Sequence, residues 1–184
     1  MNAFAETMTA LDLVPDTAPP ANRFGVDAAT LSDPSALIDH ILTRYHAVHR
    51  EQLPDLIQMA KKVVAVHADH PDVPVGLVEL LQYMVQDLLQ HMDKEERILF
   101  PLLRVGGNPF VNQPISLMRA EHVEHVVALN KLAAITHDAT PPEGACSTWC
   151  ALYAGITQLR SDLIHHIDLE NNVLFARFDA PGNS

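Results

Sequence analysis

Two stretches of this chain carry the same pair of potential metal ligands, a histidine followed four residues later by a glutamate. Residues 91–100 read HMDKEERILF and residues 166–175 read HIDLENNVLF, so His, Asp, Glu, Leu and Phe recur at the same five offsets. Residues i and i+4 of a helix lie on one face, which lets both side chains of a pair reach one ion. A repeat of this kind indicates two copies of one functional unit. The pairs are His91 with Glu95 and His166 with Glu170.

A single histidine precedes each pair at nearly the same distance. His46 lies 45 residues before His91, and His122 lies 44 residues before His166. Both pairs have apolar neighbours, and burying an unpaired carboxylate costs several kcal/mol, so a compensating cation is expected. Imidazole and carboxylate together suit iron, manganese or zinc, and two bridging carboxylates suit a dinuclear site with room for a small ligand. The predicted metal ligands are His46, His91, Glu95, His122, His166 and Glu170.

Four long helices must bring these residues together. Apolar residues recur with a period near 3.6 in four segments, each opened by a helix-start signal or a loop. Connections of roughly five to ten residues favour antiparallel neighbours, so we predict an all-α, up-down-up-down four-helix bundle. Residues 1–32 are expected to form a flexible N-terminal extension, and residues 33–180 the bundle. The helices are expected from Pro34 to before Pro71, from Asp72-Val73-Pro74 to Gly106-Gly107, from Asn112 to about His137, and from near Ser147 to about Phe178.

Composition excludes several classes of partner. The net charge is −11 and no run of Lys or Arg is present, which argues against binding to nucleic acid or to an anionic membrane. The sequence has no apolar run long enough to span a bilayer and no signal-peptide pattern, so a cytoplasmic location is expected. The two cysteines, Cys146 and Cys150, are too few for a disulfide framework and are expected to be reduced.

Several further stretches resemble the Ric (repair of iron centres) family of hemerythrin-like proteins. They are Arg44-Tyr45-His46, His49 to Pro54, Lys94 to Pro101 and Leu169 to Phe175, and the similarity covers about residues 35–178. The resemblance implies a hemerythrin-like bundle that binds two iron ions per chain, with an oxo or hydroxo bridge. It also implies that the six predicted ligands bind iron and that Glu95 and Glu170 bridge the two ions.

The resemblance implies a role in the nitrosative and oxidative stress response. This role is the repair of damaged iron–sulfur clusters, the binding and reduction of nitric oxide, or both. The implied partners are nitric oxide, oxygen and damaged iron–sulfur proteins. Whether the chain is an enzyme stays open, since nitric oxide reductase-like activity and iron donation both fit. Longer family members carry an N-terminal domain with a vicinal Cys pair, which this sequence lacks, so a thiol step is not expected.

Two other functions remain as alternatives. One is a hemerythrin-like module that binds or senses oxygen or nitric oxide without catalysis, although such modules commonly accompany a signalling domain. Oxygen carriers would also have a histidine at position 126 and an aspartate at 171, where this chain has Val126 and Asn171. The other is a structural bundle with incidental histidines, which the repeat argues against.

The remaining polar residues near the predicted ligands have two interpretations each. His49, His125 and His165 are either surface residues or residues that orient a ligand. Glu121 and Asp87 either line an entry path, accept a ligand N–H, or are solvated helix charges. His67 stays unassigned because a histidine near a helix end also complements the helix dipole.

Overall fold

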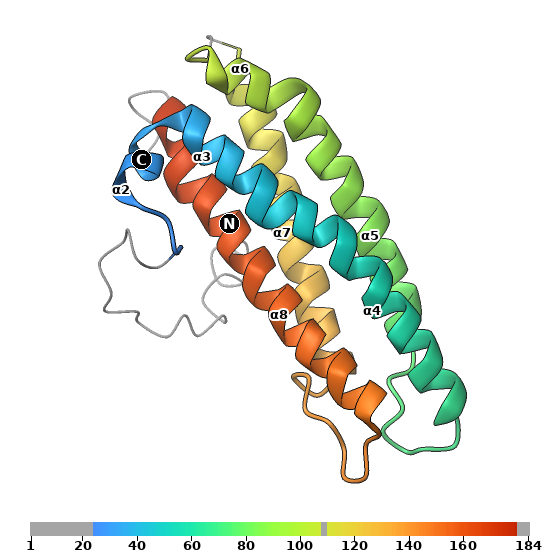
Figure 1. Cartoon of the computed structure of the whole chain (residues 1–184). Helices are drawn as coiled ribbons and strands as arrows, with labels where there is room; N and C mark the ends of the chain where they lie inside the picture. Colours follow the sequence, from blue (N-terminus) through green and yellow to red (C-terminus); the bar gives the residue numbers. More distant parts are fainter. Residues whose placement is uncertain (1–23, 108–109, 180–184) are drawn as a thin grey trace, which may run out of the picture.

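The chain folds into four long helical rods that lie side by side (Figure 1). The computed structural model describes residues 24–107 and 110–179, and these contain helices and no strands. The all-α bundle predicted from the sequence is confirmed. Rod one is α3 (Pro34–Ile41), η2 (Leu42–His46) and α4 (Ala47–Val66); rod two is α5 (Leu77–Lys94), η3 (Glu95–Leu99) and α6 (Phe100–Arg104); rod three is α7 (Asn112–Ile135); rod four is α8 (Ser147–Leu169), η4 (Glu170–Leu174) and η5 (Phe175–Phe178).

The helix starts follow local capping chemistry. The Asp33 side chain caps α3 by accepting a hydrogen bond from the backbone N–H of Ser35, and Pro34 occupies the first turn. Rod two begins later than the sequence suggested, at Leu77. Gly76 precedes it with a φ of +84°, a left-handed conformation that favours glycine and separates the Asp72-Val73-Pro74 stretch from the helix.

The segment before rod one is partly described by the structure. Residues 24–32 contain the short helix α2 (Ala28–Ser32), capped by Asp27, which accepts a hydrogen bond from the Thr30 N–H. Phe24 and Val26 are buried in the core, so residues 24–32 pack against the bundle and do not extend from it. Residues 1–23 of the expected extension lie outside the described residues, and the boundary at residue 33 stays a prediction.

The apolar core is divided into two clusters along the bundle. One cluster includes Leu81, Leu132 and Trp149, and the other includes Leu37 and Phe100. Between them lies a belt of buried polar side chains, each at most 4% exposed: His46, His49, His91, Glu95, His122, His125, His166 and Glu170.

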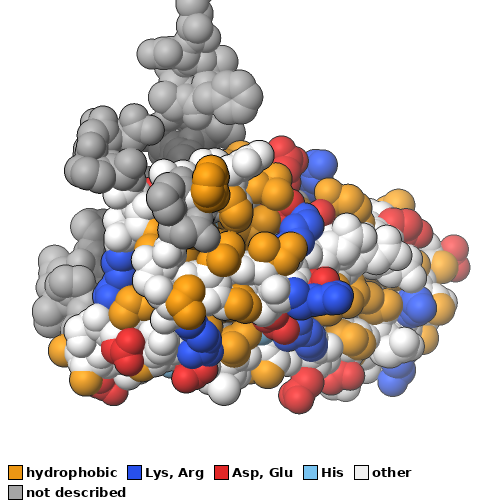
Figure 2. Space-filling view, turned by 90° about the horizontal axis from the view of Figure 1, so that it is seen from above, with side chains coloured by type: hydrophobic (Ala, Val, Ile, Leu, Met, Phe, Trp, Pro, Cys, Tyr) orange, Lys and Arg blue, Asp and Glu red, His pale blue; other side chains and the backbone are white. Residues whose placement is uncertain are grey.

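The exterior carries charged side chains of both signs interspersed with apolar ones on the face seen in Figure 2. None of the helices in the described residues has the length and apolar content needed to cross a bilayer. The polar belt inside the bundle is therefore the feature that needs a chemical explanation, because buried charge is costly without a partner.

Candidate metal centre

Three of the four rods change from α-helix to a π-helical turn at a predicted ligand. The turn η2 ends at His46, η3 begins at Glu95 and η4 begins at Glu170. A π-helical turn contains more residues than an α-helical turn, so it changes which side chains face the bundle axis, and such turns are frequent at functional sites. Rod three carries His122 within the regular α7. Helical periodicity alone did not predict these turns.

The structure brings all six predicted ligand residues together in the polar belt. They form two groups of four in which the potential ligand atoms lie within 4.8 Å of one another. Both groups contain Glu95 and Glu170, so these two carboxylates lie between the two positions. We call them the first half (His46 and His166) and the second half (His91 and His122) of the site.

The spacing of the donor atoms fits metal coordination. The Nε2 atoms of His46 and His166 are 3.1 Å apart, and those of His91 and His122 are 3.0 Å apart. Two ligands at about 2.1 Å from one ion and at right angles to each other are about 3.0 Å apart. The imidazole pair of each half is therefore spaced like neighbouring ligands of one metal ion.

The two carboxylates connect the halves. Glu95 Oε2 is 3.4 Å from the Nε2 atoms of both His46 and His91. Glu170 Oε1 is 3.0 Å from His166 Nε2, and its Oε2 is 3.1 Å from His122 Nε2. Neither oxygen of Glu95 has a hydrogen-bond partner within the described chain. A buried carboxylate in this condition is costly unless a proton or a cation neutralises it, and both groups of four residues have the donor atoms that could hold a metal ion.

The electrostatics of the site without metal show how strongly it favours positive charge. Burial and the nearby Glu170 carboxylate raise the pKa of Glu95 to about 7. Burial opposes ionisation of Glu170 as well, but the charge and hydrogen bonds of neighbouring histidines hold its pKa well below the usual range. Burial also disfavours the charge on His46, yet the nearby carboxylates of Glu170, Glu95 and Glu96 raise its pKa to about 11. Protons and metal ions therefore compete for the same donor atoms.

Three of the predicted ligand histidines are oriented by hydrogen bonds from their second ring nitrogen. His46 donates from Nδ1 to Glu96 at 2.7 Å, and His91 donates to Glu121 at 2.9 Å. His122 donates to the Asn171 side-chain oxygen at 2.9 Å. These bonds direct each Nε2 toward the site. Of the options considered for Glu121, the structure supports acceptance of a ligand N–H.

The sequence did not predict Glu96 and Asn171 as partners of the histidines. Each residue directly follows one of the two shared glutamates, but the two differ in residue type, so their shared position in the repeat did not indicate a shared role. Both carboxylate partners also contact a cation: Arg50 donates to Glu96 at 2.7 Å, and Lys94 donates to Glu121.

The fourth ligand histidine, His166, is held by packing. Its Nδ1 is buried and has no hydrogen-bond partner in the described residues. The Tyr45 ring stacks on the imidazole with 5.2 Å between centroids, and the Arg44 guanidinium lies 5.0 Å from the Tyr45 centroid. Arg44 also donates to Asp162 at 2.6 Å.

The other polar residues considered from the sequence fall into two sets. His49 and His125 are buried next to the site: His49 lies 5.5 Å from the His166 ring, and His125 lies 4.7 Å from the His91 ring. His165 is half-buried beside Phe24. His67 does not join the site, because its Nε2 contacts Sγ of Cys146, the N-cap residue of α8, at 3.2 Å.

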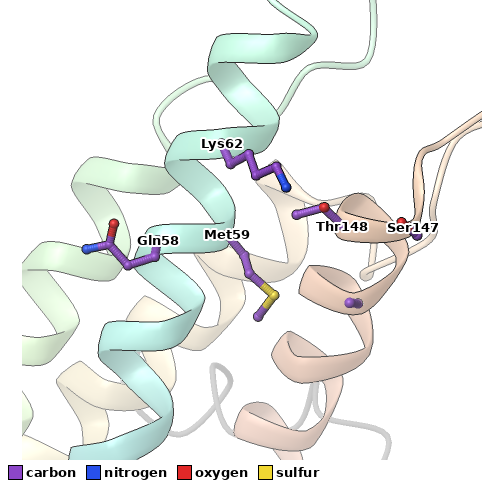
Figure 3. Close-up of a pocket in the computed structure, with 6 residues that line it drawn as sticks. Gln58, Met59, Lys62, Ser147 and Thr148 are labelled. Atoms are coloured by element: carbon purple, nitrogen blue, oxygen red, sulfur yellow. The ribbon is translucent and has the colours of Figure 1, made fainter.

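A groove on the surface is separate from the groups of predicted metal ligands. It is an open groove of about 520 Å³ between α4 and α8, where Lys62 and Thr148 point toward one another (Figure 3). None of the six predicted ligands lines this groove, which is bordered by Gln58, Met59, Lys62, Ser147, Thr148 and Ala151.

The comparisons with known proteins agree with the geometry. Over 141 residues, or 77% of its length, the chain is 52% identical to the iron-sulfur cluster repair protein YtfE of Escherichia coli O157:H7. It is 50% identical over the same length to YtfE of Dickeya chrysanthemi and 47% identical to a probable iron-sulfur cluster repair protein of Haemophilus influenzae. These similarities confirm the resemblance to the Ric family.

The matched region spans a little under two thirds of each relative, 63 to 64%. Residues 37–178 match the family model described as the hemerythrin HHE cation binding domain. This range contains all six predicted ligands and every residue that orients them. The chain belongs to the hemerythrin HHE cation-binding domain family.

Proposed function

We propose that this chain binds two iron ions at the six-residue site and acts in the repair of iron–sulfur clusters damaged by nitric oxide or oxidants. The observation that carries the proposal is the pair of buried four-donor groups that share Glu95 and Glu170. The relatives are named iron-sulfur cluster repair proteins, which supports the same role.

The donor set is compatible with iron, and the names of the relatives support iron over manganese and zinc. It consists of imidazoles and carboxylates without a thiolate, a combination that suits iron among the first-row metals and leaves coordination positions for small ligands. Bound iron would supply redox chemistry and binding sites for nitric oxide or oxygen. Glu95 and Glu170 tie the two positions together, and the apolar clusters on both sides of the belt limit access of water.

Two activities fit this site: turnover of nitric oxide, and donation of iron to a damaged iron–sulfur protein. Both need a site that accepts a change in charge without loss of the fold. The outer carboxylates support this, because Glu96 and Glu121 each link a ligand histidine to a partly exposed cation, Arg50 or Lys94.

Anaerobic reconstitution tests the proposal. The purified chain is loaded with ferrous iron, its iron content is measured, and it is mixed with an iron–sulfur enzyme inactivated by nitric oxide. We expect recovery of enzyme activity, consumption of nitric oxide, or both, and loss of these effects in Glu95→Ala. An iron-loaded protein that binds gas reversibly but neither restores the enzyme nor consumes nitric oxide would favour the binding or sensing module instead.

A further inference from the structure

A cysteine and a histidine are in contact at the end of the bundle where α4 ends and α8 begins. His67 is the C-cap residue of α4, and Cys146 is the N-cap residue of α8. His67 Nε2 is 3.2 Å from Cys146 Sγ, within hydrogen-bond reach, so the thiol can donate its proton to the imidazole. Neither residue belongs to the two groups of predicted metal ligands. The contact therefore places a nucleophile beside a base, separate from the metal centre.

Aromatic packing holds the imidazole beside the thiol. The His67 ring packs against the fully buried Trp149 with 5.1 Å between centroids. His70 packs on the same indole at 5.2 Å, and its ring is 6.5 Å from that of His67. Cys146 is half-buried, so a small molecule in solution can reach its sulfur. A nucleophile, a base and a group that orients the base are the parts of an activated thiol.

The place of Cys146 in the fold favours negative charge on its sulfur. Helix α8 is 23 residues long, and its dipole and the free N–H groups of its first turn place positive potential at the N-terminus, where Cys146 lies. Cysteines beside a histidine or at a helix N-terminus are those that react as thiolates. Cys150 is more exposed, but its Sγ lies 3.8 Å from the carbonyl oxygen of Ala145, an acceptor that cannot take its proton.

The groove between α4 and α8 begins beside this thiol. Ser147, which directly follows Cys146, lines the groove together with Thr148 and Lys62 (Figure 3). Its volume of about 520 Å³ is in the range of small-molecule sites. The Lys62 ammonium and the first-turn N–H groups of α8 suit a ligand that carries carboxylates.

We propose that Cys146 is a site of thiol–disulfide exchange with small disulfides that carry carboxylates, with His67 as the base. The thiol gives its proton to His67 Nε2, and Sγ attacks one sulfur of the disulfide. A bond forms between Sγ and that sulfur, the original sulfur–sulfur bond breaks, and its electron pair leaves with the second sulfur, which takes the proton from His67. Cys146 is thereby oxidised to a mixed disulfide, and one small thiol is released. This modification goes beyond the proposed function and does not depend on bound metal.

The test measures the rate at which each thiol is modified by glutathione disulfide. The reduced chain is mixed with the disulfide, the reaction is stopped with acid at set times, and peptide mass spectrometry follows Cys146 and Cys150 separately. The variants are His67→Gln, which removes the base, and Lys62→Gln, which removes the cation of the groove. The matched control is His70→Gln, which changes the neighbouring half-buried histidine and keeps the base.

We expect Cys146 to react about tenfold faster than the more exposed Cys150, and His67→Gln to remove this difference. The His70→Gln control should keep the rate of the unmodified chain. Loss of packing alone would expose Cys146 further and speed its reaction, so a slower reaction in His67→Gln distinguishes a base from a structural role. Equal rates at the two cysteines of the unmodified chain, or a rate at Cys146 that His67→Gln does not lower, would overturn the proposal.

A second disulfide tests the role of the groove. Lys62→Gln should slow the reaction of Cys146 with glutathione disulfide but not its reaction with the uncharged disulfide of mercaptoethanol. This result would support binding of the carboxylates in the groove. An equal rate for Lys62→Gln and the unmodified chain with glutathione disulfide would overturn the assignment of a carboxylate-bearing ligand.

Discussion

The two halves of the site have the same ligands but different supports. Each half combines two histidines with the shared Glu95 and Glu170. In the second half both histidines donate a hydrogen bond from Nδ1, to Glu121 and Asn171. In the first half His46 does so, but His166 is fixed by the stacked Tyr45 ring.

This difference shows that a repeat can preserve metal ligands while the shell around them changes. Tyr45 and Glu121 occupy equivalent places, each directly before the single histidine of its half. Tyr45 supports His166 by ring stacking, and Glu121 supports His91 by a charged hydrogen bond. A carboxylate partner makes an imidazole a stronger donor, whereas an aromatic ring constrains only its position. We therefore expect the halves to differ in metal affinity and exchange.

Removal of a shared glutamate should have the largest effect. Glu95→Ala or Glu170→Ala deletes a donor from both halves, so the metal content should fall from about two ions per chain to less than one. His46→Ala deletes a donor from the first half alone and should leave about one ion bound. Metal analysis after anaerobic loading and desalting measures both. Equal losses in Glu95→Ala and His46→Ala would show that the carboxylates are not shared.

The second-largest effect is expected on the stability of the fold, from truncation of the Tyr45 ring that stacks on His166. Tyr45 is 2% exposed, and Tyr45→Ala should lower the free energy of unfolding by about 3–5 kcal/mol. Tyr45→Phe keeps the ring and should retain both stability and metal content, because stacking and not the hydroxyl supports His166. Urea denaturation of the metal-free variants measures the change. A loss of metal in Tyr45→Phe would mean that the hydroxyl takes part in the site.

Loss of a hydrogen-bond acceptor should weaken the second half alone. Glu121→Gln replaces the charged acceptor of His91 and should lower the affinity for one ion by about tenfold to a hundredfold. Glu96→Gln makes the matched change in the first half, at His46. Competition with a chromophoric chelator gives the two affinities. If Glu121→Gln lowers the affinity for both ions equally, the two halves do not bind their ions independently.

The last prediction concerns the pH dependence of stability in the metal-free chain. Burial and neighbouring positive charge lower the pKa of His49 to about 2, from an ordinary value near 6.5. Below that ordinary value the unfolded chain binds a proton that the folded chain does not, so stability falls as the pH decreases, by up to about 1.4 kcal/mol per pH unit. His49→Leu removes this contribution. Urea denaturation between about pH 4 and 6 should therefore give a flatter profile for His49→Leu than for the unmodified chain; parallel profiles would contradict the burial of a neutral His49.

The sequence predicted the bundle and the convergence of the six residues because both depend on periodicity. A histidine and a glutamate at positions i and i+4 lie on the same face of a helix. Because this pair occurs twice, the sequence predicts that the two faces carrying the pairs point toward each other in the bundle. The π-helical turns at His46, Glu95 and Glu170 were not predicted, because the period of the apolar residues does not distinguish a short π-helical turn from the α-helix around it.

The supporting residues show where prediction from the sequence stops. Glu96 and Asn171 follow the shared glutamates at the same offset but differ in residue type, so the repeat alone did not reveal a common role. The contact between Arg44 and Asp162 joins rod one to rod four, and no local pattern indicates it. The late start of rod two depends on the left-handed Gly76, which opposed the helix-start signal at Pro74.

The most direct test of the shared carboxylates is Mössbauer spectroscopy of the chain loaded with isotopically enriched iron and oxidised. Two ferric ions held close together by Glu95 and Glu170, with an oxo or hydroxo bridge between them, should couple antiferromagnetically and give a diamagnetic ground state, with about two irons per chain. Two magnetically isolated ferric ions, or a single bound ion, would contradict the account of one site built from two halves.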